Sequence, residues 1–290
     1  MTFINWLITP LQYAFMQRAL VAALVVGVLC AILGCYVVLK SMAFIGDAMA
    51  HAVLPGIAIA YLLGGNLTLG ALIAAVIISL GIGLLSRQGT IREDTAIGIL
   101  FSAALSLGIV LISSIRSYAV DLSHILFGNV LGVSTQDLIV TIGSAIVILL
   151  SVAFLYRRFL VVLFDPILAV TQRLKVGLLR NVLLIILAVT IVVSLQTVGV
   201  GLVAALLVTP PATAYLLTRR LPSMMALSAV FGAFSSLVGL YASFYGNVSS
   251  GAAIVFTATM LFLFVFLFSP RKGVVIGLLK QWVGKRKITE

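Results

Sequence analysis

Long apolar runs, separated by short polar or charged segments, make up most of the chain. A helix that crosses the hydrocarbon layer of a membrane needs about 20 predominantly apolar residues. Such runs predict spans over residues 19–39, 42–63, 67–86, 95–115, 138–156, 181–196, 198–217, 223–243 and 251–269. The sixth and seventh runs meet at 196–198 and could form one long helix broken near Gly199 and Gly201. We therefore expect eight or nine spans.

Composition strengthens this interpretation. Hydrophobic residues make up 63% of the 290 residues and charged residues 9%, whereas soluble proteins contain about 25% charged residues. A soluble domain with this composition would expose large apolar patches and aggregate. The sequence therefore predicts an all-α, polytopic transmembrane helical bundle. We expect one membrane domain, with an outer N-terminal segment (1–18), membrane spans (19–269) and a basic cytoplasmic tail (270–290).

The basic residues predict the orientation of the chain. A net charge of +11 would suggest a nucleic-acid partner for a soluble protein. Here the basic residues flank apolar runs, so the excess of Lys and Arg in cytoplasmic loops explains them better, and no nucleic-acid partner is expected. With nine spans and the N-terminus outside, all of the 18 Lys and Arg residues except Arg18 and Arg116 fall on the inner side.

Two longer connections differ from the short turns. Residues 116–137 form an outer loop with an apolar middle, for which we expect a short helix or a re-entrant turn shielded by protein. Residues 157–180 form the longest inner loop, which is amphipathic enough to lie against another protein or the membrane interface.

Asp47 is the only acidic residue expected inside a span rather than in a loop or at a helix end. A carboxylate within the membrane costs about 2.5–3.5 kcal/mol, so it is by default a candidate functional residue. His51 follows four residues later and shares its helix face. Pro55, a further four residues on, removes a hydrogen bond to the His51 carbonyl and predicts a kink, and the freed oxygen is a possible further ligand.

Carboxylate oxygen and imidazole nitrogen together suit a divalent transition-metal ion. The pair could instead hydrogen-bond internally and tie two helices together. Two ligands are also too few for a closed metal site, and a symmetric dimer would supply two copies of Asp47 and His51. His124 in the outer loop, near Asp121, is a weaker metal candidate that could equally form a solvated surface pair.

Motifs that would supply energy or catalysis are missing. The chain contains no GxxxxGK[ST] phosphate loop and no HExxH metalloprotease motif. A chain of acids through the spans or an internal repeat would favour the alternative of a gradient-driven secondary transporter. The sequence shows no such chain of acids and no clear repeat. The sequence therefore predicts a pathway without an enzymatic site, driven by a separate subunit.

Several segments together resemble the permease subunit of bacterial ABC importers for manganese, zinc or iron. The likeness runs from about residue 12 to 270. Its most specific segments are SMAFIGDAMAHAVLPGIAIAYLLG (41–64), EDTAIGILFSAALSLGIVL (93–111), HILFGNVLG (124–132), FDPILAVTQRLKVG (164–177) and VGVGLVAALLVTPPATA (198–214). In that family the DxxxH pair, here Asp47 and His51, coordinates the metal.

The resemblance implies a multi-pass protein of the bacterial cytoplasmic membrane, surrounded by lipid, that forms a homodimer on two copies of an ABC ATPase. It implies a metal-binding solute-binding protein on the outer face, no permanently bound cofactor, and transport of Mn²⁺, with Zn²⁺ or Fe²⁺ next. Two inner segments would contact the ATPase, and they contain Phe164, Asp165, Pro166, Arg219 and Arg220. Ile167 departs from the pattern, because many relatives have an acid there.

Overall fold

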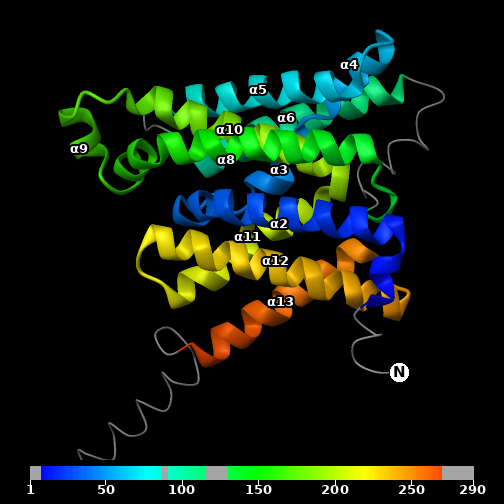
Figure 1. Ribbon diagram of the computed structural model, residues 1–290. Helices are drawn as coiled ribbons and strands as arrows, with labels where there is room; N and C mark the ends of the chain where they lie inside the picture. The colour runs from blue at the N-terminus through cyan, green and yellow to red at the C-terminus, as the bar shows by residue number, and fades with distance from the viewer. Residues whose placement is uncertain (1–7, 87–90, 115–129, 270–290) are drawn as a thin grey trace, which may run out of the picture.

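The computed structural model describes residues 8–86, 91–114 and 130–269, and every regular element in those ranges is a helix. The helices lie side by side in a layered bundle, with their axes roughly along one direction (Figure 1). Two short 3₁₀ turns, Pro10–Gln12 and Val130–Gly132, precede α2 and α8. The α-helices are α2 (Ala14–Leu39), α3 (Ile45–Ala52), α4 (Leu54–Leu62), α5 (Leu67–Leu85), α6 (Glu93–Ser113), α8 (Thr135–Phe164), α9 (Pro166–Thr171), α10 (Val176–Val198), α11 (Val200–Leu217), α12 (Leu221–Gly246) and α13 (Ser250–Phe268).

Nine spans are long and apolar enough to cross a membrane within the described ranges, which confirms the predicted helical bundle. The second of these spans combines α3 and α4. The sixth and seventh spans are separate helices, because the chain turns at Gly199 with φ of 90°. That backbone conformation is open to glycine at little steric cost. The alternative of one long broken helix is therefore wrong.

The predicted inner loop over 157–180 is also wrong for most of its length. Helix α8 continues to Phe164, α9 follows directly, and α10 already begins at Val176. Arg157 and Arg158 therefore lie on α8, where both are exposed. Long basic side chains near a helix end can keep their charges in the aqueous layer while the backbone continues. The basic pair was therefore a poor guide to the end of the helix, because α8 continues past it to Phe164.

The second span breaks where Pro55 predicts. Helix α3 ends at Ala52 and α4 begins at Leu54, with Pro55 in the first turn of α4, where a missing N–H group costs little. The carbonyl of His51 does not stay free, since it accepts the N–H of Val53. The break leaves α3 as a short separate helix.

Small residues and hydroxyl groups hold the bundle together, as in other membrane proteins. Gly27 of α2 and Gly232 of α12 meet so closely that a Cβ added to Gly232 would lie 2.6 Å from the Gly27 oxygen. On the same helix pair, Ser228 donates a hydrogen bond to the Ala31 carbonyl at 2.8 Å, and Ser236 to the Ala23 carbonyl at 3.0 Å. These contacts allow two backbones to pack in direct contact.

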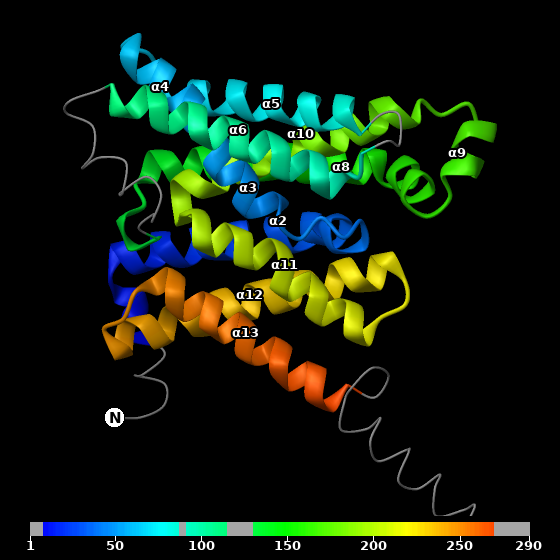
Figure 2. The same ribbon diagram turned by 180° about the vertical axis from the view of Figure 1, so that it is seen from behind.

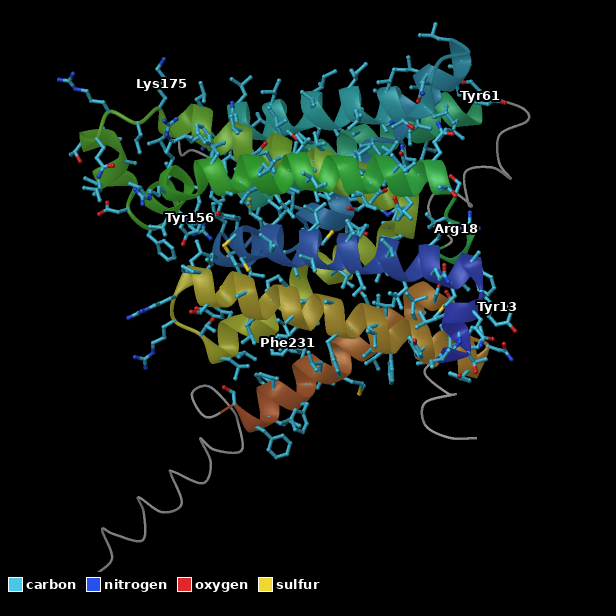
Figure 3. All side chains as sticks on the ribbon, viewed as in Figure 1. Tyr13, Arg18, Tyr61, Tyr156, Lys175 and Phe231 are labelled. Carbon is cyan, nitrogen blue, oxygen red and sulfur yellow. The ribbon has the colours of Figure 1, made fainter. Side chains whose placement is uncertain are left out.

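The two ends of the bundle differ in charge as the sequence predicts. In Figure 3 Lys175 lies at one end, near α9, whereas Arg18 lies at the opposite end with Tyr13. Arg219 and Arg220 occupy the exposed turn between α11 and α12. The end that carries α9 is therefore the one predicted to be cytoplasmic, and it is called the cytoplasmic end below.

Candidate metal-ion site and inner surface

Helix α3 lies about midway between the two ends of the bundle, between α6 and α11 (Figure 2). It packs mainly on α6, α11 and α10. Gly46 allows the close approach to α11, because a Cβ at this position would lie 3.2 Å from the Ala204 Cα. The short helix thus lies in the middle of the bundle.

Asp47 and His51 lie one turn apart on this helix, as predicted. The His51 Nε2 atom is 3.7 Å from the Asp47 Oδ1 atom, and the side chains are 30% and 56% exposed respectively. The His51 ring also packs against Phe101 of α6, with ring centroids 6.2 Å apart. This aromatic contact restricts the orientation of the imidazole. The geometry brings an oxygen and a nitrogen donor close enough to share one cation.

Within the described ranges, neither side chain is hydrogen-bonded to another helix. Among the described residues, Asp47 and His51 have their shortest polar contact with each other and make no hydrogen bond to a neighbouring helix. Half-exposed polar groups at this depth need a partner, and the described residues of one copy do not supply it. This exposure favours an accessible ligand pair over an internal tie.

The described residues of one copy offer an incomplete donor set. Over the described ranges, no cluster of three or more His, Cys, Asp or Glu side chains could hold a metal ion. Ser102 and Ser106 of α6 bond to carbonyls of their own helix, at 2.9 and 2.8 Å. His124, with Asp121, lies outside the described residues, so that metal candidate stays a prediction.

A second candidate surface lies at the cytoplasmic end. Phe164 ends α8 and is 59% exposed, and Asp165 caps α9 by accepting the Leu168 N–H at 2.9 Å. Helix α9, which begins at Pro166, projects from the bundle (Figure 1). Its Ile167 is 79% exposed. An apolar side chain displayed on a short projecting helix suits a protein partner.

Sequence reasoning missed a cluster of charges at the same end. Lys40, Glu93 and Arg180 come from three helices and meet at their inner ends. The sequence alone places each of them only in a loop or at a helix end. The sequence did offer a signal, since an acid lies at the start of one span and bases lie at the edges of two others. The pairing of these charges, however, depends on which helices are neighbours.

Together, nine apolar spans in the described ranges and an acid–imidazole pair in the middle of the bundle define a multi-pass membrane protein of the transport class. Residues 12–269 match the ABC 3 transport family, and the chain belongs to that family. It is thus a permease of the metal-ion ABC importer type in the inner membrane, which confirms the resemblance seen in the sequence.

Named relatives extend over nearly the whole chain. The manganese transport system membrane protein MntC of Halalkalibacterium halodurans is 49% identical over 95% of this chain and 94% of its own length. The "Probable iron transport system membrane protein" of Haemophilus influenzae is 43% identical over 91% of this chain and 97% of its own. A chain in the structure of PsaBC from Streptococcus pneumoniae in complex with Fab is 38% identical, with a TM-score of 0.81 over 93% of this chain and 98% of that chain.

Proposed function

We propose that this chain is the membrane permease of an ATP-driven importer for Mn²⁺, and that Asp47 and His51 bind the ion during its passage. The accessible pair on α3, halfway across the bundle, carries the proposal. A separate ABC ATPase supplies the energy at the cytoplasmic end, and a metal-binding protein delivers the ion at the outer end. The similarity to MntC and to the PsaBC chain supports this assembly.

The ion preference follows from the donor types and the relatives. A carboxylate favours harder ions, and an imidazole binds manganese, iron and zinc alike. The relative named for manganese is more similar than the one named for iron. Mn²⁺ is therefore the preferred cargo, with Fe²⁺ and Zn²⁺ as weaker competitors.

Reconstitution tests the function directly. We expect proteoliposomes that contain the chain and its co-purified ATPase to accumulate radioactive Mn²⁺ only when ATP and the metal-binding protein are present. Unlabelled Zn²⁺ and Fe²⁺ should compete less strongly than Mn²⁺. Uptake driven by an ion gradient without the ATPase would contradict the proposal and identify a secondary transporter.

We further propose that a second copy of the chain covers the face that carries Asp47. A carboxylate facing hydrocarbon is costly, whereas a two-fold axis beside α3 would bring two carboxylates and two imidazoles around one ion. Two carboxylates in one site repel each other until a cation neutralises them. The empty site is thereby primed to accept a divalent ion.

Cross-linking tests this dimer. Both native cysteines, Cys30 and Cys35, are buried, so only an introduced surface cysteine can form a disulfide between two copies. Phe44, one turn before Asp47, is 73% exposed, and we expect Phe44→Cys to form a disulfide-linked dimer in membranes. Leu150 of α8 is 65% exposed. Helix α8 lies at the front of the bundle in Figure 1, on the side away from the one seen in Figure 2, where α3 is in view. Leu150→Cys is the matched control, and equal cross-linking of both variants would refute the proposed interface.

The inner surface is proposed as the ATPase contact. Phe164, Asp165 and Pro166 lead into α9, and Arg219 and Arg220 lie in the exposed turn before α12. Both segments are at the cytoplasmic end and connect directly to membrane helices. A rigid-body movement of the ATPase could therefore reach the helices through them.

A further inference from the structure

Glu93 joins three helices at the cytoplasmic end of the bundle. Its two carboxylate oxygens each lie 3.1 Å from the Lys40 Nζ atom at the end of α2. Its Oε1 atom also lies 3.8 Å from the Arg180 Nε atom in α10. The side chains of Lys40, Glu93 and Arg180 are only 16%, 20% and 15% exposed. Charges that are this far removed from water depend on one another.

Arg180 adds a fourth helix to the cluster. It donates hydrogen bonds from Nη1 to the Ser86 carbonyl at 3.0 Å and from Nη2 to the Gly83 carbonyl at 2.6 Å. Both carbonyls belong to the last turn of α5, where backbone oxygens lack helical partners. The planar guanidinium can make these contacts and face Glu93 at the same time. Arg180 thus connects the start of α10 to α5 and α6.

The position of the cluster relates the two candidate surfaces. Four residues separate the end of α9 from the start of α10, so Arg180 lies close in sequence to the proposed ATPase contact. Glu93 is the first residue of α6, and α6 packs along α3, the helix of Asp47 and His51. In the described part of the chain, α6 packs chiefly on α3, α4 and α5 rather than on α2 or α10. The ion pair between Arg180 and Glu93 therefore supplies a polar connection from α10 to α6.

We propose that Glu93 and Arg180 transmit the movement of the ATPase-facing segment to the helices that hold the metal ion. This inference rests on the proposed function, because it needs an ATPase that moves α9 and a cargo at α3. When α10 moves, α6 follows, because separation would take the Arg180 guanidinium away from a poorly hydrated carboxylate. Both are positioning residues, since neither contacts the ion.

The test measures the number of Mn²⁺ ions transported per ATP hydrolysed by the reconstituted full complex. Glu93→Gln should lower this ratio about tenfold, the size of a typical coupling between sites, while ATP hydrolysis continues at close to the wild-type rate. Asp94→Asn is the matched control, because Asp94 is the next residue, is exposed and has no ion pair within the described ranges. It should leave the ratio unchanged.

A double variant separates transmission from simple stability. Glu93→Gln alone leaves Lys40 and Arg180 as unbalanced neighbours, whereas Lys40→Gln with Glu93→Gln restores the original net charge of the three-residue cluster. We expect the double variant to recover the melting temperature of the complex and to remain uncoupled. Glu93→Asp, which keeps the carboxylate, should retain most of the coupling.

Two results would overturn the inference. One is a normal transport ratio in Glu93→Gln, and the other is a double variant that regains transport together with stability. In both cases the wild-type complex still couples ATP hydrolysis to Mn²⁺ uptake, so the proposed function survives. If the wild-type complex itself fails to couple the two, the proposed function fails, and the inference fails with it.

Discussion

Replacing Asp47 with alanine is expected to abolish Mn²⁺ uptake while the protein still inserts and assembles with its ATPase. The carboxylate is 56% exposed and makes no contact that the bundle needs for packing. Loss of a direct metal ligand should cost at least the 10–100-fold that follows when only a supporting partner is removed, so we expect a decrease of about 100-fold or more. Radioactive Mn²⁺ uptake by proteoliposomes measures it.

Two controls separate the effect of the charge at Asp47 from the effect of losing a carboxylate elsewhere. Asp47→Asn keeps the shape of the side chain and removes its charge, so it should be almost as inactive as Asp47→Ala. Asp94→Ala removes an exposed carboxylate from the inner end of α6 and should transport normally. An inserted Asp47→Ala protein that imports Mn²⁺ at the wild-type rate would exclude a role for this pair in binding the ion.

His51→Ala should resemble Asp47→Ala for the same reason, and the two effects should not add. The two side chains act on one ion, so removing either one removes most of the binding free energy, and residues that share partners are not independent.

Much of this fold follows from the sequence because the membrane imposes simple rules. Within lipid a backbone must satisfy its own hydrogen bonds, so a long apolar run becomes a helix almost regardless of detail. The break at Val53 followed from Pro55. The distribution of Lys and Arg predicts which side of the membrane each loop faces. Helix ends were less predictable, because α8 extends to Phe164 through a basic pair that can reach the aqueous layer.

The candidate site was predictable only where it depends on local spacing. Asp47 and His51 share a face because they are four residues apart in one helix. By contrast, the Phe101 ring beside His51 and the Glu93 cluster depend on which helices become neighbours. Apolar helices in lipid are nearly uniform around their circumference, so their sequences carry little information about which faces meet. Small residues such as Gly34 mark close contacts without identifying the partner.

Gly34→Val is expected to prevent correct assembly of the bundle. Gly34 of α2 lies against α11 so closely that any added Cβ would overlap the Leu207 carbonyl oxygen and lie 2.7 Å from the Pro211 Cγ atom. Pro211 cannot donate a hydrogen bond to that same carbonyl, because proline has no N–H. The oxygen therefore projects toward α2, and only glycine leaves room for it.

The cost of Gly34→Val should be about 3 kcal/mol or more, since the atoms in the way are backbone and a proline ring rather than a flexible side chain. Helix α11 also supports α3 through Ala204 and Gly46, so a displaced α11 would disturb Asp47 as well. We expect a large decrease in the folded fraction recovered in detergent, in the melting temperature and in Mn²⁺ uptake together.

Gly143→Ala is the matched control for this prediction. Gly143 lies within α8, is exposed, and would place an added Cβ in open space with no atom within 4 Å. Alanine favours a helix by about 1 kcal/mol over glycine, so this variant should be as stable as the wild type or slightly more so. If Gly34→Val folds and melts like Gly143→Ala, α2 and α11 do not pack through Gly34. Because α11 supports α3 at Gly46, that result would also remove the support inferred here for the helix that carries Asp47 and His51.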